Sequence, residues 1–488
     1  MKVSPLMEQK KNEVVSESLK AEEKVKSSWF VLDLDGSLTQ AEQFDYSKWP
    51  QLKKFADYEI RKARAYAEEP PHVALMKEHE LVDYEPASDS GHFRWYPKGA
   101  FIKRQLENAV TQVVQNYGGL EVETPIMYDY AHPALSKYLH RFPARQYTVE
   151  SDDKEFFLRF AACFGQYMIM HDTIVSYKDL PLRFYELTHY SFRREQSGEV
   201  AGLKRLRAFT MPDMHSLVAD LDQARAEFKA QFKLCVEWMK SLKLDYEVGI
   251  RFEKAFFEEN KGFALELVKE IGRPFLLEMW PERIAYFSMK FEFNVIDNAD
   301  KASALSTVQI DVENAERFGI KYTSADGKEK LPFILHASIS GSIDRNVYAL
   351  LEDAAMKVKK NEKPTLPLWL CPTQVRFVPI TEKHVGFCNT LSDTFEKQKI
   401  RADVDDRNER MQKKVAEAER EWIPYIVVVG DKEIESGDLT VRLREQNNSQ
   451  EKIRAQDLIT EISKRTQGFP YRKLPLPVFL SRRPVFHK

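Results

Sequence analysis

A charged hairpin constrains the fold of this chain more than any other stretch of its sequence. The run F-R-R-E ends one expected strand at residues 192–195, and the run R-L-R-A-F begins the next at residues 205–209. The residues between these runs are polar and include Gly198 and Gly202, which suit a turn between antiparallel strands. The sequence therefore predicts a sheet in which these two strands are neighbours.

The side chains of this hairpin are the ones that an ATP site needs for attack at the α-phosphate. Arg193 can neutralise the charge that builds on the α-phosphate, and Arg205 can reach the outer phosphates. The ring of Phe209 can stack on adenine while the carboxylate of Glu195 accepts a hydrogen bond from its amino group. The pattern alone leaves a second interpretation open, an exposed charged hairpin with one buried phenylalanine.

Composition limits the class of protein. The 488 residues are enough for two or three domains, and 43% of them are hydrophobic. No apolar run approaches the roughly 18 residues of a membrane span, and residues 1–26 lack the apolar core of a secretory signal. The four cysteines are irregularly spaced and predict no disulfide framework. We therefore expect a cytoplasmic protein with no membrane partner.

The net charge of the chain does not indicate a nucleic-acid partner. The formal net charge is −2, so a nucleic acid would have to bind local basic patches. The tail at residues 471–488 is the best candidate because it carries five basic and no acidic residues. The alternative is a tail that its prolines and apolar side chains pack onto the protein.

Two patterns of secondary structure follow each other along the chain. Helices expected at residues 98–117 and 221–242 alternate irregularly with strands, which favours an α+β domain with an antiparallel sheet flanked by helices. From residue 363 the expected order is βαβαββα, which predicts a compact α/β module. We expect a polar N-terminal extension and remnant segment at 1–70, a catalytic domain at 71–362 and a second domain at 363–488.

Two further segments have the character of functional motifs. The run H-A-S-I-S-G-S-I-D-R at residues 336–345 places Arg345 at the start of an apolar helix, and Pro125 ends an expected strand that follows a long helix. These segments and the hairpin resemble motifs 3, 1 and 2 of the class II aminoacyl-tRNA synthetases, in the right order. The run D-L-P-L-R at residues 179–183 and G-H-F-R-W-Y-P-K-G at residues 91–99 resemble the threonyl-tRNA synthetase family, especially its archaeal form.

This resemblance implies a class II synthetase catalytic domain followed by an α/β anticodon-binding domain with a basic C-terminal tail. It implies a threonine–tRNA ligase that forms threonyl-adenylate from ATP and transfers threonine to the 3′ end of tRNA(Thr). Arg193 and Arg345 would act in catalysis. The residues that would bind ATP, accompanied by Mg²⁺, are Arg193, Glu195, Arg205, Phe209, Gln309, Ser342 and Arg345.

The resemblance also implies one zinc ion in the amino-acid pocket, held by Cys163, His215 and His336. Their positions alone would not have indicated a metal site, because they are far apart and fit no zinc-ribbon spacing. Three protein ligands with an open position are typical of a substrate site. Asp213 matches the acidic residue for the substrate amino group, whereas a substrate-contacting tyrosine aligns with either Tyr286 or Phe287.

Other implications concern RNA and partners. Asn408, Glu433 and Arg442 match positions that read anticodon bases, and motif 1 implies a homodimer. Full-length archaeal relatives begin with a domain that edits seryl-tRNA(Thr), and only about 70 residues precede the catalytic domain in this sequence. We therefore expect a shortened form without cis editing that relies on a separate trans-editing protein.

Three alternatives stay open at this point. The first is a synthetase-like RNA-binding or regulatory protein without activity, and the second is a class II enzyme for another amino acid. The third comes from the run V-L-D-L-D-G-S at residues 31–37, which resembles the first motif of haloacid-dehalogenase phosphatases. That chemistry needs a downstream lysine and an acidic pair, so two solvated aspartates in a turn are the better interpretation.

Overall fold

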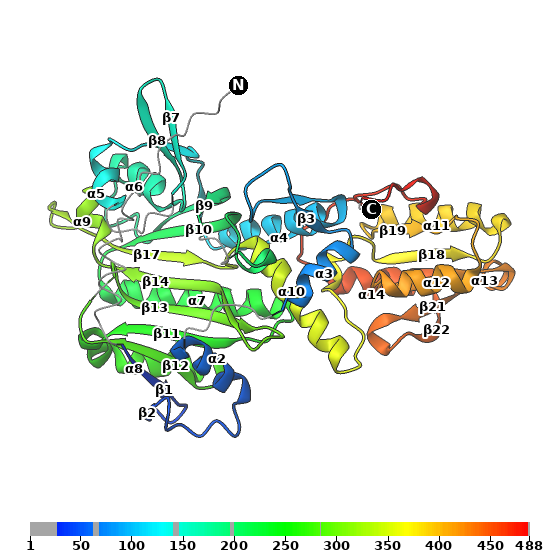
Figure 1. Cartoon of the computed structure of the whole chain (residues 1–488), viewed down its shortest axis with the longest axis horizontal. Coiled ribbons are helices and arrows are strands. Elements are labelled where there is room, and N and C mark those ends of the chain that lie inside the picture. The colour runs from blue at the N-terminus through cyan, green and yellow to red at the C-terminus, as the bar shows by residue number, and fades with distance from the viewer. Residues whose placement is uncertain (1–26, 62–67, 140–145, 196–199, 284, 487–488) are drawn as a thin grey trace, which may run out of the picture.

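The structure is a computed structural model with two α/β units lying end to end (Figure 1). No helix within its described residues is long and apolar enough to cross a membrane. Residues 1–26 and 62–67 of the N-terminal segment expected at 1–70 lie outside those residues. The described residues are 27–61, 68–139, 146–195, 200–283 and 285–486.

A ten-stranded sheet forms the larger unit, and its strands are antiparallel except at β11/β12 and β5/β9. This confirms the expectation of an antiparallel sheet in the first part of the chain. Strands β1 and β2, near the N-terminus, lie at one edge of the same sheet. In spatial order the strands are β2 (Leu38–Gln40), β1 (Ser28–Leu32), β12 (Phe275–Trp280), β11 (Glu247–Glu253), β13 (Phe287–Ile296), β14 (Ala302–Asp311), β17 (Phe333–Ser338), β10 (Ala208–Val218), β9 (Leu182–Phe192) and β5 (Leu120–Glu121).

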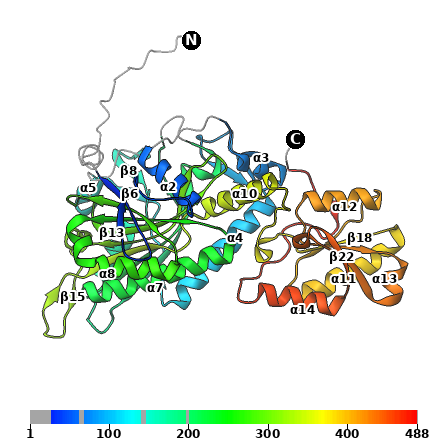
Figure 2. The same cartoon turned by 90° about the horizontal axis from the view of Figure 1, so that it is seen from below.

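Helices cover both faces of this sheet. Helices α7 (Leu221–Leu242) and α8 (Lys254–Ile271) lie side by side on one face, as Figure 2 shows. Phe228 and Phe232 of α7 pack edge-on against Phe291 of β13, so this face forms the main apolar core. Helix α2 (Pro50–Arg61) packs on the opposite face, where Gly249 leaves room for the ring of Phe55.

Helix α7 has the bounds that the sequence predicts because both ends carry local signals. The side chain of Asp220 accepts a hydrogen bond from the backbone N–H of Gln223 and caps the helix N-terminus. Lys243 ends the helix in the left-handed conformation, with a φ of 57°. Strand β5 is shorter than expected, since it ends at Glu121 and not at Thr124.

The larger unit contains further helices and short strands outside the ten-stranded sheet and the helices named above. The helix predicted at residues 98–117 is α4 (Pro97–Asn116), and it is joined to α10 (Ile343–Lys359) by the ion pair of Lys103 with Asp344 at 2.9 Å. The others are α3 (Pro71–Glu78), β3 (Val82–Tyr84), β4 (Phe93–Trp95), β6 (Met127–Asp129), α5 (Pro133–Leu139), β7 (Thr148–Ser151), β8 (Lys154–Leu158), α6 (Cys163–Asp172), the 3₁₀ turn η1 (Gly202–Lys204), α9 (Asn314–Phe318), β15 (Tyr322–Thr323) and β16 (Glu329–Lys330).

The C-terminal unit is an α/β module with a five-stranded sheet in the order β19-β18-β20-β21-β22. The expected βαβαββα order is confirmed, with α13 and β22 added. Strand β22 escaped prediction because five of its six side chains are exposed, so it has no apolar alternation. The elements are β18 (Val375–Pro379), α11 (Val385–Lys397), β19 (Ala402–Val404), α12 (Met411–Arg420), β20 (Tyr425–Val429), α13 (Asp431–Ser436), β21 (Asp438–Leu443), β22 (Ser449–Arg454) and α14 (Ala455–Thr466).

The basic C-terminal tail packs onto the protein. The backbone N–H of Val404 in β19 donates to the carbonyl of Val478, and Arg483 pairs with the buried Asp403 at 2.9 Å. Further along, the backbone N–H of Phe486 donates to Glu80 of the larger unit at 3.1 Å. These contacts match the packed alternative and connect the tail to both units.

Candidate active site and metal pocket

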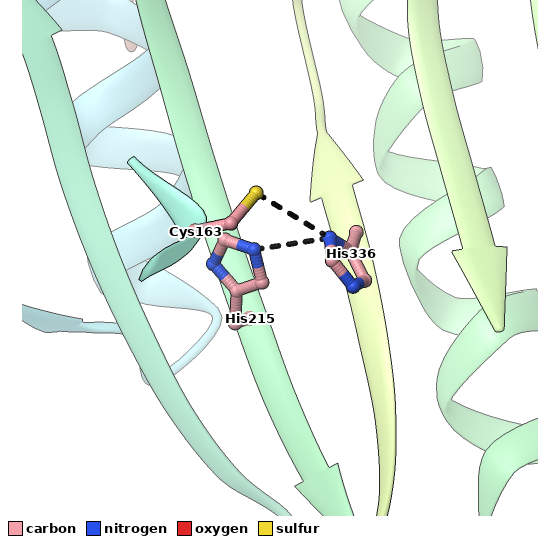
Figure 3. A group of neighbouring side chains, drawn as sticks. All are labelled: Cys163, His215 and His336. Carbon is pink, nitrogen blue, oxygen red and sulfur yellow. Dashed lines mark hydrogen bonds between the residues drawn. The ribbon is translucent and has the colours of Figure 1, made fainter. Parts of the chain in front are cut away.

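The predicted metal ligands lie together where α6 meets strands β10 and β17 of the ten-stranded sheet. Cys163 is the first residue of α6, while His215 and His336 face each other across β10 and β17 in directly paired register. Figure 3 shows the three side chains pointing toward one another from these elements. One ligand atom from each residue lies within 4.8 Å of the others. The fold therefore assembles a Cys-His-His group from distant parts of the sequence.

The outer nitrogen of each histidine ring has a hydrogen-bond partner that sets the tautomer. His215 Nδ1 lies 2.8 Å from Gln166 Oε1, and Gln166 Nε2 donates to the carbonyl of Asp213, so the amide orientation is fixed. His336 Nε2 lies 2.7 Å from Asp311 Oδ2. The inner atoms, His215 Nε2 and His336 Nδ1, then face each other as lone pairs 3.1 Å apart, an arrangement that a cation would stabilise. The group fits a metal ion on this ground.

The charge states around the pocket agree with that arrangement. Burial, reinforced by His336, lowers the pKa of His215 well below its ordinary value, so the ring is neutral as a metal ligand must be. Burial alone would raise the pKa of Asp311, but its hydrogen bond with His336 and backbone N–H groups hold the pKa below the usual value. Asp311 is therefore a carboxylate that orients and polarises the His336 ring.

Side chains beside the metal group form the rest of a small pocket. Asp213 lies on the same face of β10 as His215, and burial together with nearby Glu186 raises its pKa to about 7. The ring of Tyr286 lies 5.3 Å from that of His336. Phe287 packs instead against Trp280, so of the two aligned aromatics Tyr286 is the one beside the metal group.

Gln309, predicted to contact the nucleotide, lies beside the metal group. Its position on β14 is directly opposite His336 on β17, and its Nε2 donates to the hydroxyl of Tyr286 at 2.9 Å. The register of four strands therefore sets His215, His336, Gln309 and Lys290 in one row across the sheet.

The predicted ATP-binding arginines lie near one another, at the ends of β9 and β10 and at the start of α10. Arg193 follows β9, Arg205 precedes β10, and Arg345 lies in the first turn of α10. Burial lowers the pKa of Arg345, and the charges of Arg193 and Arg205 lower it further, whereas Glu195 opposes them. Like charges held this close together favour an anionic ligand. We call Arg193, Arg205 and Arg345 the arginine cluster.

The other predicted ATP residues lie around this cluster. Glu195 is buried and accepts a hydrogen bond from Arg205 Nε at 3.1 Å. The guanidinium of Arg193 lies 6.0 Å from the ring centroid of Phe209. Ser342 occupies the N-cap position of α10 without a capping hydrogen bond from its side chain, and its buried hydroxyl has no hydrogen-bond partner among the described residues. A phosphate or other oxygen-rich ligand at this helix N-terminus would accept a hydrogen bond from the Ser342 hydroxyl.

Two supporting residues were missed in the sequence. Arg207 donates from Nε and Nη2 to the carbonyl of Glu195, at 3.0 and 2.6 Å, and from Nη1 to Asp89 at 2.5 Å. Asp344 accepts hydrogen bonds from Lys103 and from the backbone N–H of Thr210. Their only signal was position, since each lies within two residues of a predicted site residue. They hold Glu195 and the start of α10 in place.

The structure describes the hairpin loop only from residue 200 onward. Residues 196–199, which include the predicted Gly198, lie outside the described residues. Gly202 has a φ of 48°, and a Cβ atom there would lie 2.2 Å from His72 Nε2, so this position requires glycine.

The residues predicted to read the anticodon lie in the C-terminal unit. Asn408 follows β19, Glu433 is in α13 and Arg442 is in β21. The Glu433 carboxylate accepts hydrogen bonds from the backbone N–H of Gly430 and the hydroxyl of Thr440. Arg442 pairs loosely with Glu419 at 3.6 Å, and its Nε is buried without a partner among the described residues.

The phosphatase-like run lies in the turn between β1 and β2. The backbone N–H of Leu34 donates to Asp33, and that of Ser37 donates to Asp35 at 2.8 Å. Hydrogen bonds from Ser37 lower the pKa of Asp35. Both carboxylates therefore stabilise a surface turn.

Comparison with known proteins identifies the family. Residues 147–354 match the tRNA synthetase class II core domain (G, H, P, S and T), and residues 374–465 match the anticodon binding domain. The chain is 58% identical to the threonine–tRNA ligase of Thermococcus sibiricus over 98% of its length, and 54% identical to that of Methanosarcina barkeri, also over 98%. The chain belongs to the threonine–tRNA ligase family. It is therefore a class II aminoacyl-tRNA synthetase, and the two-domain fold expected from the sequence is confirmed.

A further relative shows how much of the full-length ligase this chain matches, and two solved structures show the same fold. The threonine–tRNA ligase of Pyrococcus horikoshii is 58% identical, and the match spans 77% of that relative's length. Among solved structures, the RNA binding domain of threonyl-tRNA synthetase from Cryptosporidium parvum aligns with a TM-score of 0.71 at 22% identity, over 82% of this chain and 99% of that one. The prolyl-tRNA synthetase of the same organism aligns with a TM-score of 0.64 over 82% of this chain and 75% of that one. These two structures share the fold of the ligase family.

Proposed function

We propose that this chain joins L-threonine to tRNA(Thr) in two steps, with ATP converted to AMP and diphosphate. The observation that carries the proposal is the presence of the Cys-His-His group and the arginine cluster in one domain, where β10 carries His215 and Arg205 precedes the same strand. The first suits a hydroxylated amino acid, and the second suits a polyphosphate. Membership of the threonine–tRNA ligase family supports the same reaction.

Zinc is the metal that fits Cys163, His215 and His336 best, because a thiolate and two imidazoles suit it and leave an open coordination position. When bound, it would act as a Lewis acid for the amino and hydroxyl groups of threonine. Valine, which has no hydroxyl, should be rejected by a large factor, whereas serine, one methyl smaller, should be separated by only about 1–3 kcal/mol.

Threonine binding would also use the chain's own residues next to the metal group. Asp213 would receive the substrate amino group, and its burial makes a charged partner favourable there. Tyr286 and Gln309, joined by a hydrogen bond of 2.9 Å, would close the opposite side of the pocket.

In the first step the threonine carboxylate attacks the α-phosphate of ATP, and the bond from that phosphorus to the diphosphate oxygen breaks. Arg193 would neutralise the α-phosphate, and Arg205 and Arg345 would hold the outer phosphates together with the Mg²⁺ that accompanies ATP. Glu195 and Phe209 would hold the adenine, and Ser342 would add its hydroxyl at the helix N-terminus.

In the second step the 3′-hydroxyl of the terminal adenosine of tRNA attacks the carbonyl carbon of the adenylate. The new ester carries threonine, AMP leaves with the electrons of the broken acyl–phosphate bond, and the hydroxyl proton passes to a phosphate oxygen of AMP or to water. Neither step requires a dedicated protein base, so positioning and electrostatic stabilisation account for the rate.

The C-terminal unit supplies recognition of the tRNA in this proposal. Asn408, Glu433 and Arg442 would contact anticodon bases, since single-stranded loops expose base edges to such side chains. Thr440 and Arg442 of β21 share a sheet face with Gln450 and Lys452 of β22, which supplies further polar and basic groups. We propose residues 71–362 as the catalytic domain, 363–488 as the anticodon-binding domain, and a cytoplasmic location.

A homodimer is part of the proposal because an apolar surface lies along motif 1 and the neighbouring strand. The exposed side chains there are Leu120, Ile126, Met127 and Tyr190, with exposed fractions of 42% to 54%. Glu107 of α4 is buried, and its Oε1 has no hydrogen-bond partner among the described residues. A second copy on this surface would bury the apolar side chains.

The dependence on a separate editing protein stays a prediction. We expect the purified chain to form seryl-tRNA(Thr) and not to hydrolyse it. Rapid release of serine from preformed seryl-tRNA(Thr) by the pure protein would show that the chain edits its own product.

Aminoacylation of tRNA(Thr) transcripts with labelled threonine tests the proposed function. We expect charging of the natural transcript and weak charging of a transcript with a changed anticodon. Absence of charging with threonine, by a folded protein that contains its metal, would refute the proposal.

A further inference from the structure

Lys204 is a buried lysine in the 3₁₀ turn η1, at the end of the hairpin loop. Its residue is 8% exposed, and its Nζ donates to Asp297 Oδ2 at 2.9 Å. The ammonium group also lies 5.6 Å from the ring centroid of Tyr58 and 5.8 Å from that of Tyr348. This side chain is therefore held inside the protein by groups from α2, α10 and the loop that follows β13.

Asp297 is itself fixed on both of its oxygens. Oδ1 accepts hydrogen bonds from the backbone N–H groups of Ala299 and Lys301, each at 2.9 Å. Oδ2 accepts from the hydroxyl of Tyr348 at 3.0 Å as well as from Lys204. The carboxylate thus offers Lys204 a rigid anchor rather than a flexible surface partner.

The backbone of Lys204 contacts the arginine cluster directly. Arg345 Nε donates to the carbonyl of Lys204 at 2.9 Å, and Arg345 Nη1 donates to the carbonyl of Ala304 at 3.3 Å. The side chain of Lys204 therefore anchors the turn, while its carbonyl orients the guanidinium of Arg345.

A second contact clamps the same turn against α10. Gly202 packs directly on the ring of His72, and His72 Nδ1 lies 2.7 Å from Glu352 Oε1. Glu352 and Tyr348 both belong to α10, which also carries Arg345. The turn η1 and helix α10 are thus held together at Gly202 and at Lys204.

We propose that the buried Lys204–Asp297 pair is a positioning device for ATP binding: it fixes the turn whose carbonyl holds Arg345 against the outer phosphates. The proposal rests on the proposed function, which assigns Arg345 to those phosphates. Lys204 does not contact ATP in this account. Its loss would leave the arginines present but Arg345 misplaced, and misplacement of a charged group by about 1 Å is expensive in a preorganised site.

The test compares Lys204→Met, Asp297→Asn and the double variant by calorimetric titration with Mg–ATP and, separately, with threonine. The expected result is that each of the three variants binds ATP more weakly, on the order of tenfold to a hundredfold, with threonine affinity unchanged. The double variant should be no worse than the single variants, because both act through one turn. Lys54→Met, which removes the exposed pair of Lys54 with Asp300, is the matched control and should bind ATP normally.

Two results would overturn the proposal. Unchanged ATP affinity in folded Lys204→Met would show that the pair does not position Arg345. Weak binding in Lys204→Met with normal or tighter binding in Asp297→Asn would show that Lys204 contacts the phosphates itself. Arg345→Gln separates this proposal from the proposed function, since normal ATP binding by that variant would refute the assignment of Arg345 whatever Lys204 does.

If Lys204→Met and Asp297→Asn do not fold, the pH dependence of ATP binding by the wild-type chain, compared with that of the conservative variant Lys204→Arg, decides the matter. Burial, opposed by Asp297, lowers the pKa of Lys204 to about 8, so the ion pair is lost as the pH rises through that value. Among the described residues, the titratable or charged groups that face Lys204 are Asp297, Lys301, Arg345, Tyr58 and Tyr348. ATP affinity should fall between pH 7 and pH 9, and Lys204→Arg should keep its affinity over that range; an equal loss in both would contradict the proposal.

Discussion

The metal pocket and the arginine cluster are built around strands of one sheet, yet their charged groups are held in different ways. In the pocket, side chains hold side chains: Gln166 fixes His215, and Asp311 fixes His336. In the cluster, Arg345 is held by backbone carbonyls of a loop and a strand, and its neighbours repel it. The pocket is therefore preorganised for one ion, whereas the cluster depends on an anionic ligand to offset its own repulsion.

Removing a ligand from the pocket should give the largest effect. Cys163→Ala should lose the metal and lower the rate of threonine-dependent ATP–diphosphate exchange by more than about 10³-fold, because outer partners alone are worth 10- to 100-fold. Metal content and exchange are measured on the same sample. Cys388→Ala, at a buried cysteine of the C-terminal unit, is the control and should keep both. A metal-free Cys163→Ala enzyme with normal exchange would remove the metal from the account.

Removing a charge from the cluster should give the next largest effect and spare the metal. Arg345→Gln should lower the exchange rate by about 10²- to 10³-fold, as loss of one preorganised donor to a charged transition state does. Its metal content should stay at the wild-type level. Arg61→Gln, at an arginine whose side chain is 73% exposed, is the control. Loss of metal in Arg345→Gln would contradict the separation of the two regions.

An outer partner of the pocket should matter less than a ligand. Gln166→Met removes the acceptor for His215 Nδ1 and should weaken metal affinity by about 10- to 100-fold. Titration with a competing chelator measures this affinity. Activity should return when excess metal is supplied, and failure to recover would mean that Gln166 does more than orient His215.

A substitution in the C-terminal unit should have the smallest effect on the reaction. Arg442→Gln should lower kcat/KM for tRNA about tenfold, because one base contact is lost, and leave ATP–diphosphate exchange unchanged. Steady-state aminoacylation and exchange assays provide both values. An equal fall in both would show that Arg442 supports the fold rather than the anticodon contact.

The two regions also differ in how far the sequence reveals them. The arginines belong to local motifs with strand, turn and helix signals, so their place on a hairpin and a helix N-terminus could be predicted from residue types alone. Cys163, His215 and His336 could be connected only through a family resemblance, because a strand pairing between β10 and β17 brings them together. Gln166, Arg207 and Asp311 look like ordinary polar residues until the fold places them.

The fold shows the same contrast between local and distant information. Helix α7 was predictable because its cap and its apolar stripe are local, and strand β22 was not because its side chains are exposed and polar. The place of β1 in the sheet depends on pairing with β12, more than two hundred residues away, which no local pattern specifies.

The central claim is that a zinc-containing pocket selects threonine for activation by ATP. Exchange of diphosphate into ATP, measured on protein whose metal content is known, tests this claim most directly. Threonine, serine, valine and proline are compared at equal concentration. The account predicts about one zinc per chain, strong exchange with threonine, weaker exchange with serine and none with valine. Folded, zinc-loaded protein that supports no exchange with threonine, or as much with valine, would contradict it.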